Sequence, residues 1–157
     1  MLRKLVSAGL VAAVAAVWPS LGGASNHEPF GFGEAARDSL RVISGIFVAE
    51  STADLRGVWL DESQPCTAFR SLRVTVTLDY SRGQTTRTIT RRRTGAVQNC
   101  AEGGPNFGFT LRARRHRLAC PNGRWRPGFY TFQVRTRHLA SGLVAIGTVG
   151  WNNRQRC

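Results

Sequence analysis

The chain has 157 residues, of which 42% are hydrophobic, and a formal net charge of +13 at pH 7. This length supports one domain and excludes two large ones, and the hydrophobic content excludes a wholly disordered chain. The charge is uneven. Residues 26–62 contain three Arg and seven acidic residues, whereas residues 63–157 contain seventeen Arg and only two acidic residues, Asp79 and Glu102.

Nearly every cation is an arginine, since Lys4 is the only lysine of the chain. A GC-rich genome, which favours arginine codons, explains that choice of residue. It does not explain the large excess of positive over negative charge. Guanidinium groups bind phosphate, sulfate and carboxylate in a bidentate geometry, so an anion-binding surface is the functional interpretation of the excess.

Residues 1–25 predict a secretory signal peptide. Arg3 and Lys4 form its positive start, residues 5–18 are an apolar stretch of fourteen residues, and small residues at 22–25 offer a cleavage site. A transmembrane helix needs about twenty apolar residues, and the chain has no second apolar run of this length. We therefore expect an exported protein, secreted or associated with the cell envelope, that has no membrane span after cleavage.

The remaining chain predicts a β-domain. Residues 26–38 have no hydrophobic periodicity and contain Pro29, Gly31 and Gly33, so we interpret them as a flexible lead-in before a domain of residues 39–157. Strict alternation of apolar and polar residues predicts the clearest strands, and Trp59 is expected in the core. The expected strands, with turn residues between them, are 40–48, 55–60, 72–80, 85–91, 107–114, 128–138 and 143–151.

About seven short strands without long helices favour an all-β fold, a single antiparallel sandwich. The run WRPGFYTFQV, from Trp125 to Val134, resembles the corner that opens the penultimate strand in bacterial Ig-like and fibronectin-like sandwiches. This resemblance implies an Ig-like sandwich in which Tyr130 locks the corner. Phe132 stands where antibody domains have a cysteine, so no disulfide between the sheets is expected there.

All four cysteines, Cys66, Cys100, Cys120 and Cys157, lie in the exported part, where an even number predicts two disulfides. Our preferred pairing is Cys100 with Cys120 and Cys66 with Cys157, although sequence alone leaves the other two pairings open. A zinc site is disfavoured because the chain has no C-x-x-C pair. We expect no metal and no cofactor.

Enzymatic motifs are weak. Serine-hydrolase chemistry lacks a G-x-S-x-G motif. A ribonuclease-like enzyme acting on a polyanion would need histidines and a carboxylate that converge on a phosphate, and no spacing ties His116 or His138 to an acidic residue. Neighbouring arginines should lower the pKa of His116, and His138 is expected to be a partly buried turn residue. We therefore predict no catalytic residues and keep the ribonuclease-like enzyme as the alternative.

The basic part of the chain yields the main functional hypothesis. We expect a non-catalytic binding or structural module at the cell envelope that associates with an anionic polymer or a protein partner, without specific nucleic-acid recognition. Trp125 is expected to be available for stacking on a sugar or base. A solvated surface that only maintains solubility is the competing interpretation. The predicted anion-binding patch contains Arg112, Arg114, Arg115, Arg117, Arg124, Trp125, Arg126, Arg135 and Arg137.

Overall fold

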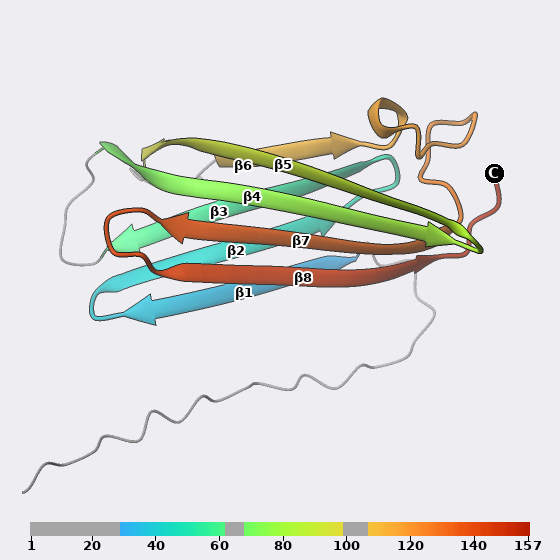
Figure 1. The fold of residues 1–157 in the computed structure, drawn as a ribbon. Helices are drawn as coiled ribbons and strands as arrows, with labels where there is room; N and C mark the ends of the chain where they lie inside the picture. Colours follow the sequence, from blue (N-terminus) through green and yellow to red (C-terminus); the bar gives the residue numbers. More distant parts are fainter. Residues whose placement is uncertain (1–28, 62–67, 99–106) are drawn as a thin grey trace, which may run out of the picture.

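A computed structural model describes residues 29–61, 68–98 and 107–157. They form eight β-strands and a short 3-10 turn, η1, in one antiparallel sandwich (Figure 1). The predicted fold class is therefore confirmed, with eight strands instead of about seven. Within the described residues, no helix has the length and apolar character that crossing a membrane requires. The elements are β1 Phe30–Arg37, β2 Leu40–Val48, β3 Thr52–Asp61, β4 Ala68–Arg82, β5 Thr85–Gln98, β6 Phe107–Arg112, η1 Arg114–His116, β7 Gly128–His138 and β8 Val144–Asn153.

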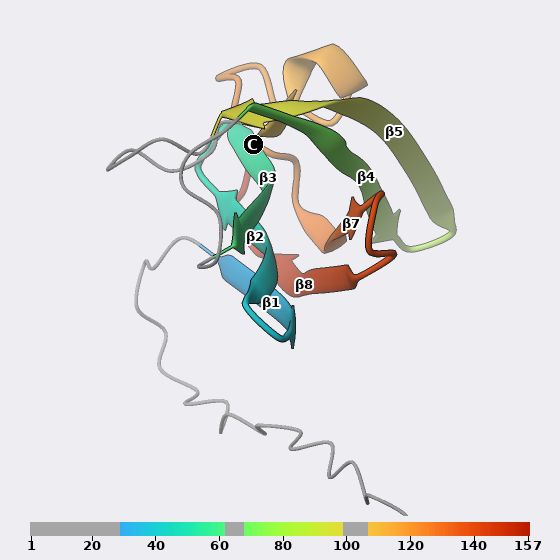
Figure 2. The same ribbon diagram turned by 90° about the vertical axis from the view of Figure 1, so that its left-hand side faces the viewer.

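The two sheets have the strand pairing of an Ig-like sandwich. The first sheet has the order β1-β2-β3-β6 and the second has the order β5-β4-β7-β8. Strands β2, β3, β4, β6, β7 and β8 pair as strands A, B, C, E, F and G of that fold do, and β5 lies beside β4 as strand C′ lies beside C. The two layers face each other across the core (Figure 2).

The corner that opens β7 has the predicted tyrosine lock. The Tyr130 hydroxyl donates a hydrogen bond to the backbone oxygen of Arg126, 2.8 Å away, while its ring is fully buried. Burial raises the pKa of Tyr130, so the hydroxyl remains a donor. Phe132 stacks on Tyr130 with 5.9 Å between ring centroids and occupies the position of the antibody cysteine. The corner thereby fixes where β7 enters the second sheet.

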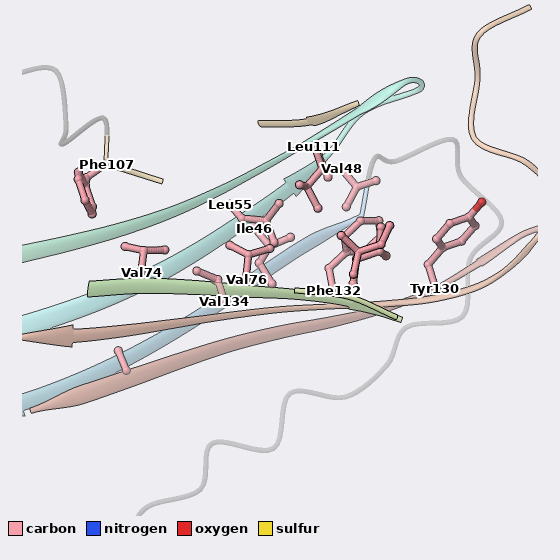
Figure 3. Packing of buried hydrophobic residues seen from close by; sticks show 14 of the residues in the cluster. Ile46, Val48, Leu55, Val74, Val76, Phe107, Leu111, Tyr130, Phe132 and Val134 are labelled. Atoms are coloured by element: carbon pink, nitrogen blue, oxygen red, sulfur yellow. The ribbon is translucent and has the colours of Figure 1, made fainter. Parts of the chain in front are cut away.

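Alternate residues of both sheets fill the interior (Figure 3). Val76 of β4, Val134 of β7 and Leu55 of β3 are fully buried, and Trp59 is a core residue as predicted. A polar link joins the two sheets within the core: the Ser44 hydroxyl lies 2.8 Å from the Thr136 hydroxyl and 3.0 Å from the backbone oxygen of Ala145. Both buried hydroxyls are therefore hydrogen-bonded, as burial of a polar group requires.

The segment predicted as a flexible lead-in is instead largely β1, which pairs with β2 along its whole length. Its inward positions include Gly31 and Gly33, which lie against β8. A Cβ atom at Gly33 would collide with the backbone oxygen of Ile146, and one at Gly31 would lie 2.9 Å from that of Thr148. Glycine therefore allows β1 to approach the backbone of β8 directly, which closes one side of the sandwich.

The predicted disulfide pairing is wrong. Cys120 is joined to Cys157, with 5.1 Å between their Cα atoms. The β7–β8 hairpin returns the chain to the end of the sandwich where β7 begins, and this places the C-terminal residue beside Cys120. The expected Cys100–Cys120 pair was based on the position of these cysteines on either side of the strand at Phe107, which does not reveal this return. Cys66 and Cys100 lie outside the described residues, as does the predicted signal peptide.

Candidate anion-binding face

The predicted arginine patch does not form as one surface. Arg112, Arg114, Arg135 and Arg137 are all exposed, as the alternation predicted. However, β6 belongs to the first sheet and β7 to the second. The two strands also run in opposite directions, so their C-terminal ends lie at opposite ends of the sandwich (Figure 1). The predicted residues therefore divide into two separate groups.

The first group lies at the end of β6. Arg112 and Arg114 line a hollow of about 330 Å³ together with Thr52 and Asn122, among others. The Arg114 guanidinium donates to the backbone oxygen of Pro121 over 3.4 Å. The predicted patch residues Arg115 and Arg117 belong to η1 and the residue after it, and both are exposed.

Trp125 is not a stacking platform, contrary to expectation. It is 1% exposed, and its ring packs edge-on against Tyr130 and Phe132. Its indole N–H donates to the backbone oxygen of Ala49 over 3.0 Å. Burial of so large an aromatic surface explains this position, because an indole contributes more in a core than on a wetted turn.

The arginines on either side of Trp125 already have partners within the chain. Arg124 forms an ion pair of 3.0 Å with Glu50. The guanidinium of Arg126 donates to the backbone oxygen of Ala119 over 2.9 Å. Glu50 therefore reduces the charge that Arg124 can offer to a ligand.

The second group is larger than predicted and lies on the outward side of the second sheet. Strand register brings Arg73 of β4 directly opposite Arg137 of β7, and places Thr75 of β4 between Arg92 of β5 and Arg135 of β7. These five side chains line a hollow of about 220 Å³. We call them the arginine face: Arg73, Thr75, Arg92, Arg135 and Arg137.

The arginine face has no internal counter-charge among the described residues. None of its four guanidinium groups takes part in the ion pairs found there. The Nε atom of Arg73 is buried without a hydrogen-bond partner. Asp79, the one acidic residue at an outward position of the described part of this sheet, lies four residues from Thr75 along β4 and accepts a hydrogen bond from Thr88. Like charges directly opposite each other in a sheet are destabilising, so a bound anion would relieve the repulsion.

The predicted patch left out Arg73 and Arg92 because it grouped arginines that are close in sequence around β6 and β7. The alternation along β4 did predict that Arg73 points outward. What was missing was the register that sets β4 between β5 and β7. Knowledge of the strand order would have been enough to assemble the face.

The two histidines of the enzymatic alternative do not meet. A backbone bond from Arg126 to Leu118 holds the chain after η1 beside the start of β7. His138 ends that eleven-residue strand, and a strand of this length spans about 35 Å. Burial lowers the pKa of His116, and the positive charges of Arg91 and other nearby arginines lower it further. General acid–base catalysis by this pair is therefore out of reach.

His138 has a local structural contact. Its Nδ1 atom lies 2.7 Å from the Ser141 hydroxyl, which also accepts a hydrogen bond from the backbone N–H of Leu143. These bonds close the turn between β7 and β8, and the imidazole packs against Trp59 with 5.3 Å between ring centroids. The arrangement matches the partly buried turn residue that we expected.

Comparison with protein-family models, curated proteins and solved structures finds no match for this chain. The functional argument therefore rests on the chemistry of its own surfaces. Among the described residues, no three His, Cys, Asp or Glu side chains are grouped as metal ligands would be. At the arginine face, four guanidinium groups converge on one hollow, and none of them forms an ion pair with another described residue. It suits an anion that presents several oxygen atoms.

Proposed function

We propose that this protein is an exported, non-catalytic binding module that associates with an anionic polymer at the cell envelope through the arginine face. The observation that carries the proposal is the convergence of Arg73, Arg92, Arg135 and Arg137 on one hollow without acidic partners. The signal-peptide pattern of residues 1–25 supports export, because a positive start, an apolar stretch and small residues follow in the required order.

The geometry favours a polymer over an isolated ion. Four guanidinium groups line the hollow, and together they carry more positive charge than one phosphate or sulfate group can neutralise. Successive charges of a polymer can engage all four. Binding should be sequence-independent, because Trp125 is buried and the face has no aromatic residue with which to read bases.

Paired substitutions of equal charge test the proposal. Arg135→Gln with Arg137→Gln removes two charges from the arginine face, and Arg112→Gln with Arg114→Gln removes two from the opposite end. We expect the first pair to elute from a heparin column at much lower salt and to reduce the slope of log K against log salt by about two. The second pair should change both quantities much less.

Either of two results would refute the arginine face as the binding site. If the two double variants shift elution equally, only net charge matters. If neither shifts elution, the basic charge maintains solubility and does not bind a polymer. Circular dichroism of both variants provides the control for folding, since all four side chains are exposed and their replacement leaves the core unchanged.

A further inference from the structure

A group of aromatic side chains lies exposed on the outward side of the first sheet. The exposed fractions are 65% for Phe30, 53% for Phe32 and 46% for Phe47. Phe30 of β1 is directly opposite Phe47 of β2, and Phe32 is directly opposite Gly45. We call these four residues the aromatic face. Single exposed apolar residues are ordinary, but three phenylalanines on adjacent strands indicate an interaction surface.

Gly45 is the second unusual feature of this face. A Cβ atom built on Gly45 would meet nothing within 4 Å, whereas one on Gly57 or Gly95 would lie under 3.0 Å from a neighbouring side chain. Of the strand glycines in the described residues, Gly45 alone has this open space. Glycine inside a strand weakens it, and often marks a place where another chain approaches closely. Among the described residues, no contact requires glycine at position 45.

Two ion pairs flank the aromatic face. Glu34 pairs with Arg41 over 2.6 Å, and Asp54 pairs with Arg56 over 3.3 Å. Both pairs lie at outward positions of the first sheet, beside the phenylalanines. On a chain with a net charge of +13, most surfaces repel a second copy of the same chain. Two copies can meet through this apolar face with less repulsion than through the arginine face.

We propose that the aromatic face binds a second copy of this chain. In a twofold dimer the same surface serves both partners, so a phenyl ring of one copy fills the open space above Gly45 of the other. The second sheet lies on the other side of each sandwich (Figure 2), and the two arginine faces therefore point outward from opposite sides of the dimer. Dimerisation does not depend on polymer binding, which uses the other sheet.

Sedimentation equilibrium of the exported chain from about 1 to about 100 μM tests the dimer. We expect the natural sequence to dimerise more strongly in high salt, because salt screens the repulsion between two cationic copies while it weakens polymer binding. Gly45→Glu places a charge in the open space without removing any packed atom. It should raise the dimer Kd by about tenfold or more, since each substitution occurs twice in the interface.

Phe32→Thr combined with Phe47→Thr is the second variant and should raise the Kd similarly, because threonine keeps the strand propensity and removes the ring. The matched control is Phe129→Thr combined with Ile146→Thr, at residues that are 50% and 49% exposed on the second sheet. This control should dimerise normally.

A natural chain that stays monomeric up to about 100 μM would overturn the proposal and leave the face to a different protein or an apolar ligand. A dimer that neither Gly45→Glu nor the phenylalanine variant weakens would also overturn it. Retention of heparin binding by monomeric Gly45→Glu would show that the two proposals stand separately.

Discussion

Removal of the Cys120–Cys157 disulfide should cost the fold about 4 kcal/mol. The bond closes a loop with a sequence separation of 37, and the chain-entropy relation gives about 4 kcal/mol for a loop of this length, through expansion of the unfolded state. The native structure should change little. Asn153, four residues before Cys157, remains bonded to the backbone oxygens of Trp125 and Arg126 over 2.8 and 3.0 Å.

Urea unfolding of Cys120→Ala combined with Cys157→Ser, followed by circular dichroism, measures this loss. The double substitution avoids a free thiol that could pair with Cys66 or Cys100. Besides the lower free energy of unfolding, we expect a larger m-value, because the opened loop exposes more surface in the unfolded chain. A loss of less than about 1 kcal/mol with an unchanged m-value would refute the reasoning. Non-reducing peptide mapping of the natural chain provides the control, and should recover Cys120 linked to Cys157.

Two further substitutions test the corner and the buried histidine. Tyr130→Phe should lower the free energy of unfolding by about 1 kcal/mol in urea titrations. The loss is small because the backbone oxygen of Arg126 keeps its hydrogen bond from Asn153. A loss above about 3 kcal/mol would contradict this account. Burial and nearby arginines lower the pKa of His116 from 6.5 in the folded state, so protonation favours the unfolded chain. The stability that neutral His116 contributes is fully present above pH 6.5. It is lost as the pH falls from there towards the folded-state pKa. His116→Asn should therefore lose stability less steeply over that window than the natural chain does, and parallel pH profiles would show that His116 is not responsible.

Alternation predicted most of the strands correctly where the buried side chains are large. The alternate apolar residues from Leu72 to Tyr80 on β4 point inward as expected, and so do Tyr130, Phe132 and Val134 on β7. The tyrosine corner was also predictable, since its residues are adjacent in sequence. The arginine face was not, because it requires the register of three strands that are far apart along the chain.

Strand β1 was missed because its pattern is the reverse of an ordinary amphipathic strand. Its inward residues are Gly31, Gly33 and the small Ala35, and the two glycines allow the backbone of β8 to approach. Phe30 and Phe32 point outward. A pattern search for large apolar residues on the inner face finds none in β1, because its inward residues are small. The same reversal produces the exposed phenylalanines of the aromatic face, so the failed prediction and the proposed interface have one cause.

The position of β5 gives its arginines a role that needs no ligand. Within the described residues β5 pairs only with β4, so its other side presents backbone groups on which a foreign strand could add. Arg87, Arg91, Arg92 and Arg93 are exposed along this strand. Charged side chains on such an edge oppose pairing with a strand of another molecule, a contact through which β-proteins aggregate. The exposed arginines of β5 should therefore lower the tendency of this edge to pair with a strand of another molecule.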